Sequence, residues 1–238
     1  MSLPYGIQLG AGISLGAGIG LGASGAPPGP LVPTNNYWSF DPSYLGPNLG
    51  IGQAGEWNSL PVGDPNMEIF ATNPETSIGL GVLTGDVSLQ TYSSKVMFTV
   101  YVATEDTGDI PLDLAGIGVA YRSVNLSNPL GTDNQSWGYR QNGTVLFNSN
   151  IITTGLPTYG PLDYIDIACD FTVGLAWVRV NGGAWNGGGA DPAMQLNGIY
   201  IPTASPLYPA GGPGAQNYID AMDVSKYTYN IPSGYTAI

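Results

Sequence analysis

The chain has 238 residues with 17 acidic and five basic side chains, a formal net charge of −12. Five Lys and Arg residues are too few to neutralise a run of phosphates, and this excludes nucleic acid as a partner. Since the sequence has no histidine and one cysteine, Ser-His and Cys-His catalysis, histidine zinc sites and an intramolecular disulfide are excluded. Abundant Gly (36) and Pro (20) with 43% hydrophobic residues favour an all-β, loop-rich protein.

Residues 1–36 are predicted to be an extended, Gly-rich anchoring arm that ends in a Pro-rich spacer. A hexapeptide occurs three times at 6–23, as GIQLGA, GISLGA and GIGLGA. In an extended chain this repeat puts glycines on one side and large apolar side chains on the other. Glycine disfavours an isolated strand, so we expect the arm to dock on another subunit by strand addition. The predicted docking residues are Ile7, Leu9, Ile13, Leu15, Ile19 and Leu21.

Two other interpretations of the repeat remain open. Its glycines are also spaced as GxxxG, which packs transmembrane helices. The high glycine content and the absence of flanking Lys or Arg argue against a membrane span, and we expect none. The repeat could also be a flexible tail, although a solvated linker does not require Ile and Leu pairs.

The rest of the chain is predicted to be a collar followed by a sandwich. Residues 37–66 are aromatic but interrupted by Pro and Gly, which predicts an irregular collar. Residues 67–238 contain short β-runs separated by turn sequences, typical of a two-sheet antiparallel β-sandwich. The run at 95–103 is apolar on both faces, so we place it centrally. The expected strands are 67–71, 78–82, 87–92, 95–103, 116–122, 136–140, 144–148, 164–170, 174–180, 198–203 and 225–231.

A series of motifs in the second half of the chain resembles a known family. An alternating strand at 165–170 ends in an Asp, and a return strand carries Trp177 before the Asn181-Gly182 turn. Trp185, three glycines at 187–189 and Asp191-Pro192 follow. In this order the motifs resemble the SPRY-like, concanavalin-type β-sandwich found in bacteriophage virion proteins. The resemblance covers about residues 95–238; it departs at 204–224, where Pro and Gly replace a plainer connection.

The resemblance implies that the chain is a structural protein of a bacteriophage virion. From the residues present we expect no enzymatic activity and no cofactor. The chain would serve as a capsid decoration, head fibre or tail or baseplate fibre protein, with other virion proteins as partners. The arm would dock in the particle and the sandwich would be displayed outward for host attachment. Such components are usually symmetric homo-oligomers, and by analogy with fibres we expect a trimer. The alternative is a carbohydrate-active enzyme or lectin on a concanavalin-like sandwich.

Few residues suggest other chemistry. The acidic cluster Glu105–Asp109 could supply paired carboxylates or calcium ligands, but its loop position and ligand order favour solvated charge, so we predict no catalytic or metal site. Cys169 is predicted to be a small core residue.

A host-surface carbohydrate needs an apolar platform with polar groups around it. Trp137, Tyr139, Trp185 and Asn186 could provide one. The alternative is that these aromatic rings belong to the core or to an interface.

Overall fold

The computed structural model describes residues 38–47, 49–52, 68–71, 77–83, 87–104, 116–212, 217–221 and 229–238. Their regular secondary structure is nearly all β, with one α-helical turn, α1 (Leu89–Tyr92), and one 3-10 turn, η1 (Trp185–Gly187). The strands are β1 (Trp38–Leu45), β2 (Leu49–Gly52), β3 (Glu68–Ala71), β4 (Gly79–Leu83), β5 (Lys95–Thr104), β6 (Gly116–Tyr121), β7 (Ser136–Arg140), β8 (Val145–Phe147), β9 (Asn150–Thr153), β10 (Tyr164–Asp170), β11 (Leu175–Val180), β12 (Ile199–Tyr200), β13 (Leu207–Gly212), β14 (Asn217–Ala221) and β15 (Thr236–Ala237).

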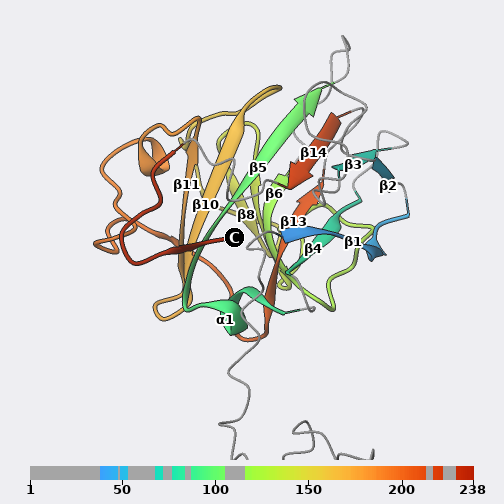
Figure 1. Cartoon of the computed structure of the whole chain (residues 1–238), viewed down its shortest axis with the longest axis horizontal. Helices are drawn as coiled ribbons and strands as arrows, with labels where there is room; N and C mark the ends of the chain where they lie inside the picture. Colours follow the sequence, from blue (N-terminus) through green and yellow to red (C-terminus); the bar gives the residue numbers. More distant parts are fainter. Residues whose placement is uncertain are drawn as a thin grey trace, which may run out of the picture. The chain divides into compact units, whose positions relative to one another are not determined.

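The strands form two sheets, which confirms the predicted sandwich. The seven-stranded sheet has the order β1-β4-β13-β6-β7-β8-β9, and the eight-stranded sheet has the order β12-β11-β10-β5-β14-β3-β2. The remaining strand, β15, pairs with β5 and makes the one parallel pairing between described strands. Figure 1 shows β11, β10, β5 and β14 side by side. The predicted central position of β5 is confirmed, since β10 and β14 flank it.

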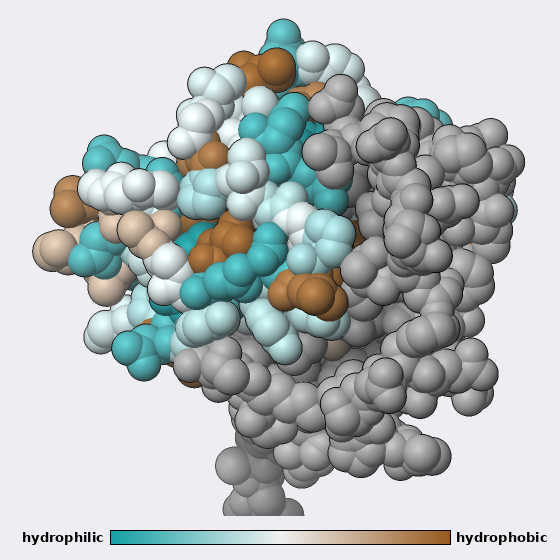
Figure 2. Space-filling model, turned by 90° about the horizontal axis from the view of Figure 1, so that it is seen from above, coloured by the Kyte–Doolittle hydropathy of each residue, from teal (hydrophilic) through white to brown (hydrophobic). Residues whose placement is uncertain are grey.

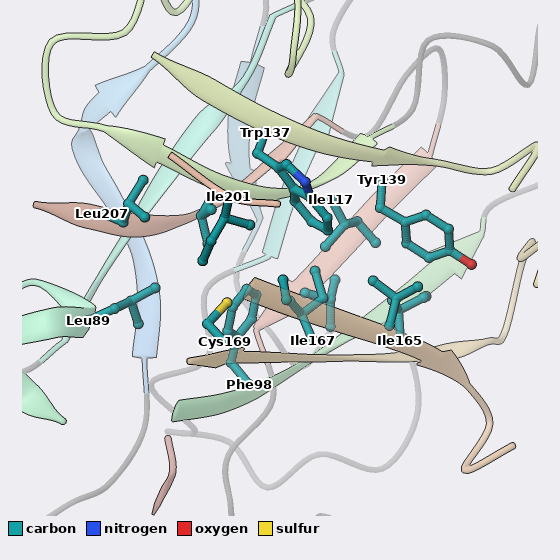
Figure 3. Close-up of a cluster of buried hydrophobic side chains, with 14 of the residues drawn as sticks. Leu89, Phe98, Ile117, Trp137, Tyr139, Ile165, Ile167, Cys169, Ile201 and Leu207 are labelled. Carbon is teal, nitrogen blue, oxygen red and sulfur yellow. The ribbon is translucent and has the colours of Figure 1, made fainter. Parts of the chain in front are cut away.

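The main core lies between the two sheets, as Figure 3 shows. Strand β10 follows the predicted alternation: Ile165, Ile167 and Cys169 point into this core. The seven-stranded sheet contributes Ile117, Trp137 and Tyr139 from the opposite side. Burial of an alternating apolar face on each sheet accounts for the strand register, because a one-residue slip would turn these side chains outward.

The outer faces of both sheets are partly covered by loops. On the seven-stranded sheet, a Cβ added to Gly138 would lie 2.7 Å from the Cβ of Leu130, so the loop before β7 packs directly on the strand. On the eight-stranded sheet, Trp177 packs edge-on against Tyr235, with ring centroids 6.5 Å apart. The C-terminal segment therefore covers part of that face.

Several predicted elements differ in the structure. The range 37–66 is not an irregular collar throughout, since β1 and β2 lie within it and belong to the two sheets. Residues 87–92 were expected to form a strand, but the Ser88 hydroxyl accepts a hydrogen bond from the Thr91 amide and caps α1. Within the predicted strand 198–203, only β12 forms. Strands β9, β13 and β14 were not predicted from the pattern. Of the run 225–231, residues 225–228 lie outside the described residues, and 229–231 form no strand.

Strand β13 is the most informative of these differences. Its Pro209, with the glycines that follow, argued against a strand in the interior of a sheet. In the structure β13 lies between β4 and β6, but its pairing with β4 is limited to Ala210 and Gly211.

The described helices include none with the length and apolar character needed to cross a bilayer.

Candidate functional site

Two residue groups that the sequence singles out lie outside the described residues. The first is the docking face of the arm, formed by Ile7, Leu9, Ile13, Leu15, Ile19 and Leu21. The second is the acidic cluster at 105–109. The part of the chain that the structure describes holds no group of three or more acidic or cysteine side chains arranged to bind a metal ion.

Trp137 and Tyr139 are core residues, and this removes both from the predicted sugar platform. Neither side chain has any exposed surface. The Tyr139 hydroxyl donates to the carbonyl of Pro157, and the Tyr159 hydroxyl donates to the carbonyl of Tyr139 at 3.0 Å. Their alternation on β7 places both rings between the sheets, which is the alternative that the sequence left open.

Trp185 and Asn186 hold the chain after β11 against the sheet. The Asn186 side chain accepts a hydrogen bond from the Val178 amide at 2.9 Å and donates to the Asn197 carbonyl at 2.8 Å. The Trp185 ring lies 4.4 Å from the guanidinium carbon of Arg179. Since both side chains already bind protein groups, this pair has a structural role here.

A buried ion pair lies on the outer face of the eight-stranded sheet. Asp166 on β10 is opposite Arg179 on β11, and Arg179 Nε donates to Asp166 Oδ2 at 2.6 Å. The Thr99 hydroxyl donates to the other carboxylate oxygen at 2.5 Å. Asp166 is only 1% exposed. Both of its oxygens therefore have protein partners, as a buried charge requires.

A second ion pair lies four residues further along β10. Lys95 Nζ is 3.0 Å from Asp170 Oδ2, which also accepts from Gln195 Nε2 at 2.7 Å. Burial alone would raise the pKa of Asp170, but hydrogen bonds from Thr172, Gln195 and Lys95 outweigh it and lower the pKa below its usual value. The carboxylate is thus held in its ionised form.

These two carboxylates do not form a catalytic pair. Their separation along β10 is about 13 Å for four strand residues. Glycosidases place their two carboxyl groups about 5 to 9.5 Å apart. The lowered pKa of Asp170 also makes it a poor proton donor near neutral pH. These two carboxylates, with Arg179 and Lys95, therefore stabilise the sheet and its covering segments.

The exposed surface with the clearest potential for binding lies where the two sheets end together. Strand β9 ends the seven-stranded sheet and β12 ends the eight-stranded sheet. The rings of Phe147 on β8 and Tyr200 on β12 are in contact, with centroids 5.6 Å apart. We call the surface formed by Phe147, Ile151, Ile152 and Tyr200 the uncharged edge.

Three of its four side chains are open to solvent, and the fourth, Phe147, is half-buried. Ile151 is 60% exposed and Tyr200 is 55% exposed, although both belong to strands. The sequence around them contains no Asp, Glu, Lys or Arg over residues 141–162 or 192–219. Of the strands in the second stretch only β12 lies at this edge, because β13 and β14 are inside the two sheets. In a chain of net charge −12, the uncharged run 141–162 around β9 makes the edge a candidate interaction surface.

Figure 2 shows one side of the molecule, seen from above. On that face the described residues present hydrophobic side chains as separate spots among hydrophilic ones. Isolated apolar side chains are usual on protein surfaces and indicate no binding by themselves. Sequence reasoning missed the uncharged edge because β9 was not predicted, although the uncharged run 141–162 was visible in the sequence.

Comparison with known proteins identifies the architecture. No protein-family model and no curated protein matches the sequence. The SPRY domain of human HERC1 aligns with a TM-score of 0.52 at 15% identity, covering 79% of this chain and 99% of that domain. The fold is SPRY-like. The PSpry domain of TRIM65 aligns with a TM-score of 0.50 at 11% identity, covering 78% of this chain and 92% of that one.

These similarities confirm the SPRY-like part of the predicted resemblance. At 11–15% identity they show a shared fold and nothing about what this chain binds. A bacteriophage origin, a glycan ligand and a virion location remain predictions from the sequence.

Proposed function

We propose that this chain is a non-catalytic structural component of a bacteriophage virion. In this proposal the N-terminal arm docks on other virion proteins, and the SPRY-like sandwich is displayed outward. The particle would contain the chain as a homo-oligomer. The uncharged edge is the observation that carries the proposal, because it offers the sandwich a surface for protein contact that requires no desolvation of charge.

The contacts of the charged residues support a role in binding in preference to catalysis. Asp166 and Asp170 are each occupied by protein donors, and their separation does not suit acid–base work on a glycosidic bond. The burial of Trp137 and Tyr139 also weakens the glycan hypothesis. Assembly through protein surfaces is the function that these observations favour.

The proposal is tested by following incorporation of the full chain into phage particles. A phage deleted for the gene is complemented with wild-type chain or with the double variant Ile13→Asp/Leu15→Asp, and the chain is quantified in purified particles. We expect the wild type to be incorporated and the variant to be reduced at least about tenfold, because two charges would be desolvated in an apolar contact.

Ser14→Asp is the matched control, because it places a charge in the same repeat but on the side that carries glycine. It should be incorporated like the wild type. Absence of the wild-type chain from particles, or equal incorporation of the double variant, would contradict the proposal. Turnover of a polysaccharide by the purified chain would instead support the carbohydrate-active alternative.

A further inference from the structure

Among the described strands, β9 presents a hydrogen-bonding edge that no other strand pairs with. Asn148 (φ 52°) and Ser149 (φ 61°) form the two-residue turn that joins β8 to β9. In such a hairpin the flanking residues, Phe147 and Asn150, hydrogen-bond to each other, so the N–H and C=O of Ile151 point away from β8. Within the described residues β9 pairs with no strand other than β8.

Two of the three other described sheet ends, β1 and β12, are less suited to accept a strand; the third, β2, has the sequence Leu-Gly-Ile-Gly, in which a leucine and an isoleucine alternate with glycine. At the opposite end of the seven-stranded sheet, β1 contains Pro42 and an irregular register with β4. Strand β12 is only two residues long. Proline, bulges and shortness are the usual means by which edge strands avoid pairing with other chains. Strand β9 has a register shift against β8, but no proline and no charge.

Its side chains match a second copy of the same strand. The sequence of β9 is Asn-Ile-Ile-Thr, with Ile151 and Ile152 both exposed. In an antiparallel pair with its twofold axis at Ile151, Ile151 faces Ile151 of the other copy and Ile152 faces Asn150. Cross-strand pairs of β-branched residues stabilise such pairing.

The net negative charge of the chain also favours a second copy as the partner of β9. Two molecules of net charge −12 repel each other, and this repulsion is weakest where neither presents a charged side chain. Residues 141–162 carry no charge, and β9 lies near their middle. One acidic residue, Asp133, lies beside the β8–β9 turn, where its carbonyl accepts a hydrogen bond from the Asn148 amide at 2.9 Å. Its carboxylate already accepts from the Gln135 amide and the Ser136 hydroxyl. A basic partner would gain nothing from this edge, whereas a second copy can approach it without bringing carboxylates together.

We infer that β9 pairs with β9 of a second copy of the chain, antiparallel and centred on Ile151, which joins the two seven-stranded sheets into one. This inference rests on the proposed function in one respect: it names the partner of the uncharged edge. The twofold pairing would make the dimer the basic unit of the oligomer, in place of the trimer expected by analogy with fibres.

The pairing is tested by cysteine cross-linking of the purified full chain. In a hydrogen-bonded antiparallel pair the opposed Cα atoms are about 5.5 Å apart, within the range that a disulfide bridges. Ile151→Cys should therefore give a covalent dimer under mild oxidation. Val173→Cys is the control, because Val173 is also exposed but lies in the turn between β10 and β11. The native Cys169 is fully buried and should not contribute.

A charge variant tests the same surface without oxidation. Analytical ultracentrifugation of the wild type should show a monomer–dimer equilibrium, and Ile151→Lys should raise the dimer dissociation constant by at least about tenfold through like-charge repulsion. Val173→Lys should leave it unchanged. Circular dichroism and thermal unfolding of each variant confirm that the fold is retained.

Each outcome decides a different point. A wild type that is monomeric at all concentrations, a trimer, or a dimer insensitive to Ile151→Lys would overturn the β9 pairing. A monomeric chain that is still incorporated into particles would overturn the pairing alone. A dimer that forms through Ile151 but is absent from particles would support the pairing and overturn the virion function.

Discussion

Arg179 and Asp166 form a buried ion pair between neighbouring strands of the eight-stranded sheet, with Nε and Oδ2 2.6 Å apart. The same guanidinium donates from Nη2 to the carbonyl of Asn230 at 2.6 Å and lies beneath the ring of Trp185. One side chain thus joins the sheet, the segment after β11 and the C-terminal segment. Through Arg179, the ion pair therefore holds the segment after β11 and the C-terminal segment against the outer face of the sheet.

Removing one partner of this pair should destabilise the fold strongly. Arg179→Met leaves Asp166 buried without its counter-charge, and we expect a loss of about 3–5 kcal/mol in the free energy of unfolding. Urea denaturation measures the loss. The control is Asp41→Asn, which breaks the more exposed pair between Asp41 and Arg122 and should cost about 1 kcal/mol or less. Equal losses in the two variants would argue against the structural role of Arg179.

The close approach of β6 and β7 should make one glycine irreplaceable. A Cβ at Gly118 would lie 1.9 Å from the carbonyl oxygen of Trp137, which belongs to the adjacent backbone. Gly118→Ala should therefore lower the free energy of unfolding by about 1–3 kcal/mol or more.

Gly116→Ala is a control in the same strand, because its nearest neighbour would be 3.6 Å away, an ordinary contact. Thermal unfolding followed by circular dichroism compares the two variants. If Gly116→Ala is as destabilising as Gly118→Ala, the clash with Trp137 is not the cause.

Stability should fall on acidification through Asp170. Its pKa is lower in the folded chain than the ordinary value of 3.8, so the contribution to stability is complete above that value. The contribution is lost as the pH falls through the folded-state pKa, where Lys95 and Gln195 lose an ionised partner. Asp170→Asn should remove this part of the pH dependence while lowering stability at neutral pH.

Denaturation at a series of acidic pH values checks this expectation. The difference between wild type and Asp170→Asn should shrink as the pH falls. A difference that stays constant with pH would mean that the ionised carboxylate is not responsible.

The Cys169 thiol should be unreactive in the folded chain. Its side chain has no exposed surface, and burial, with a contribution from the charge of Asp170, raises its pKa well above the ordinary value. We expect a thiol reagent at mildly alkaline pH to modify it only after denaturation. Val173→Cys, with an exposed second thiol, should react at once and serves as the positive control. Rapid modification of the wild type would contradict the burial of Cys169.

The amino-acid sequence indicated the sandwich best where alternation was regular. Ile165, Ile167 and Cys169 alternate with Asp166, Ala168 and Asp170, and β10 has this register in the structure. Turn sequences such as Asn181-Gly182 have the positive φ angles that their residue types favour. Such features are local, so they can be predicted from neighbours in the sequence.

Long-range contacts decided the rest. Residues 38–45 look irregular because Pro42 interrupts them, yet Trp38 and Phe40 enter the core because β4 lies beside them. The spacing of Trp137 and Tyr139 in the sequence could not show whether they lie at the surface or in the core. The position of the opposite sheet determines which face of β7 is buried.

By itself the sequence determined the all-β class, the acidic and nearly cation-free surface chemistry and the glycine-backed repeat at 6–23, because composition and short-range periodicity fix these properties. Only the tertiary structure decided that Asp166 and Arg179 form a buried ion pair. It also decided that β9 is the last strand of its sheet, with its two isoleucines exposed. Strand order sets which backbone groups and side chains lose their solvent, and strand order depends on pairings between residues far apart in the chain.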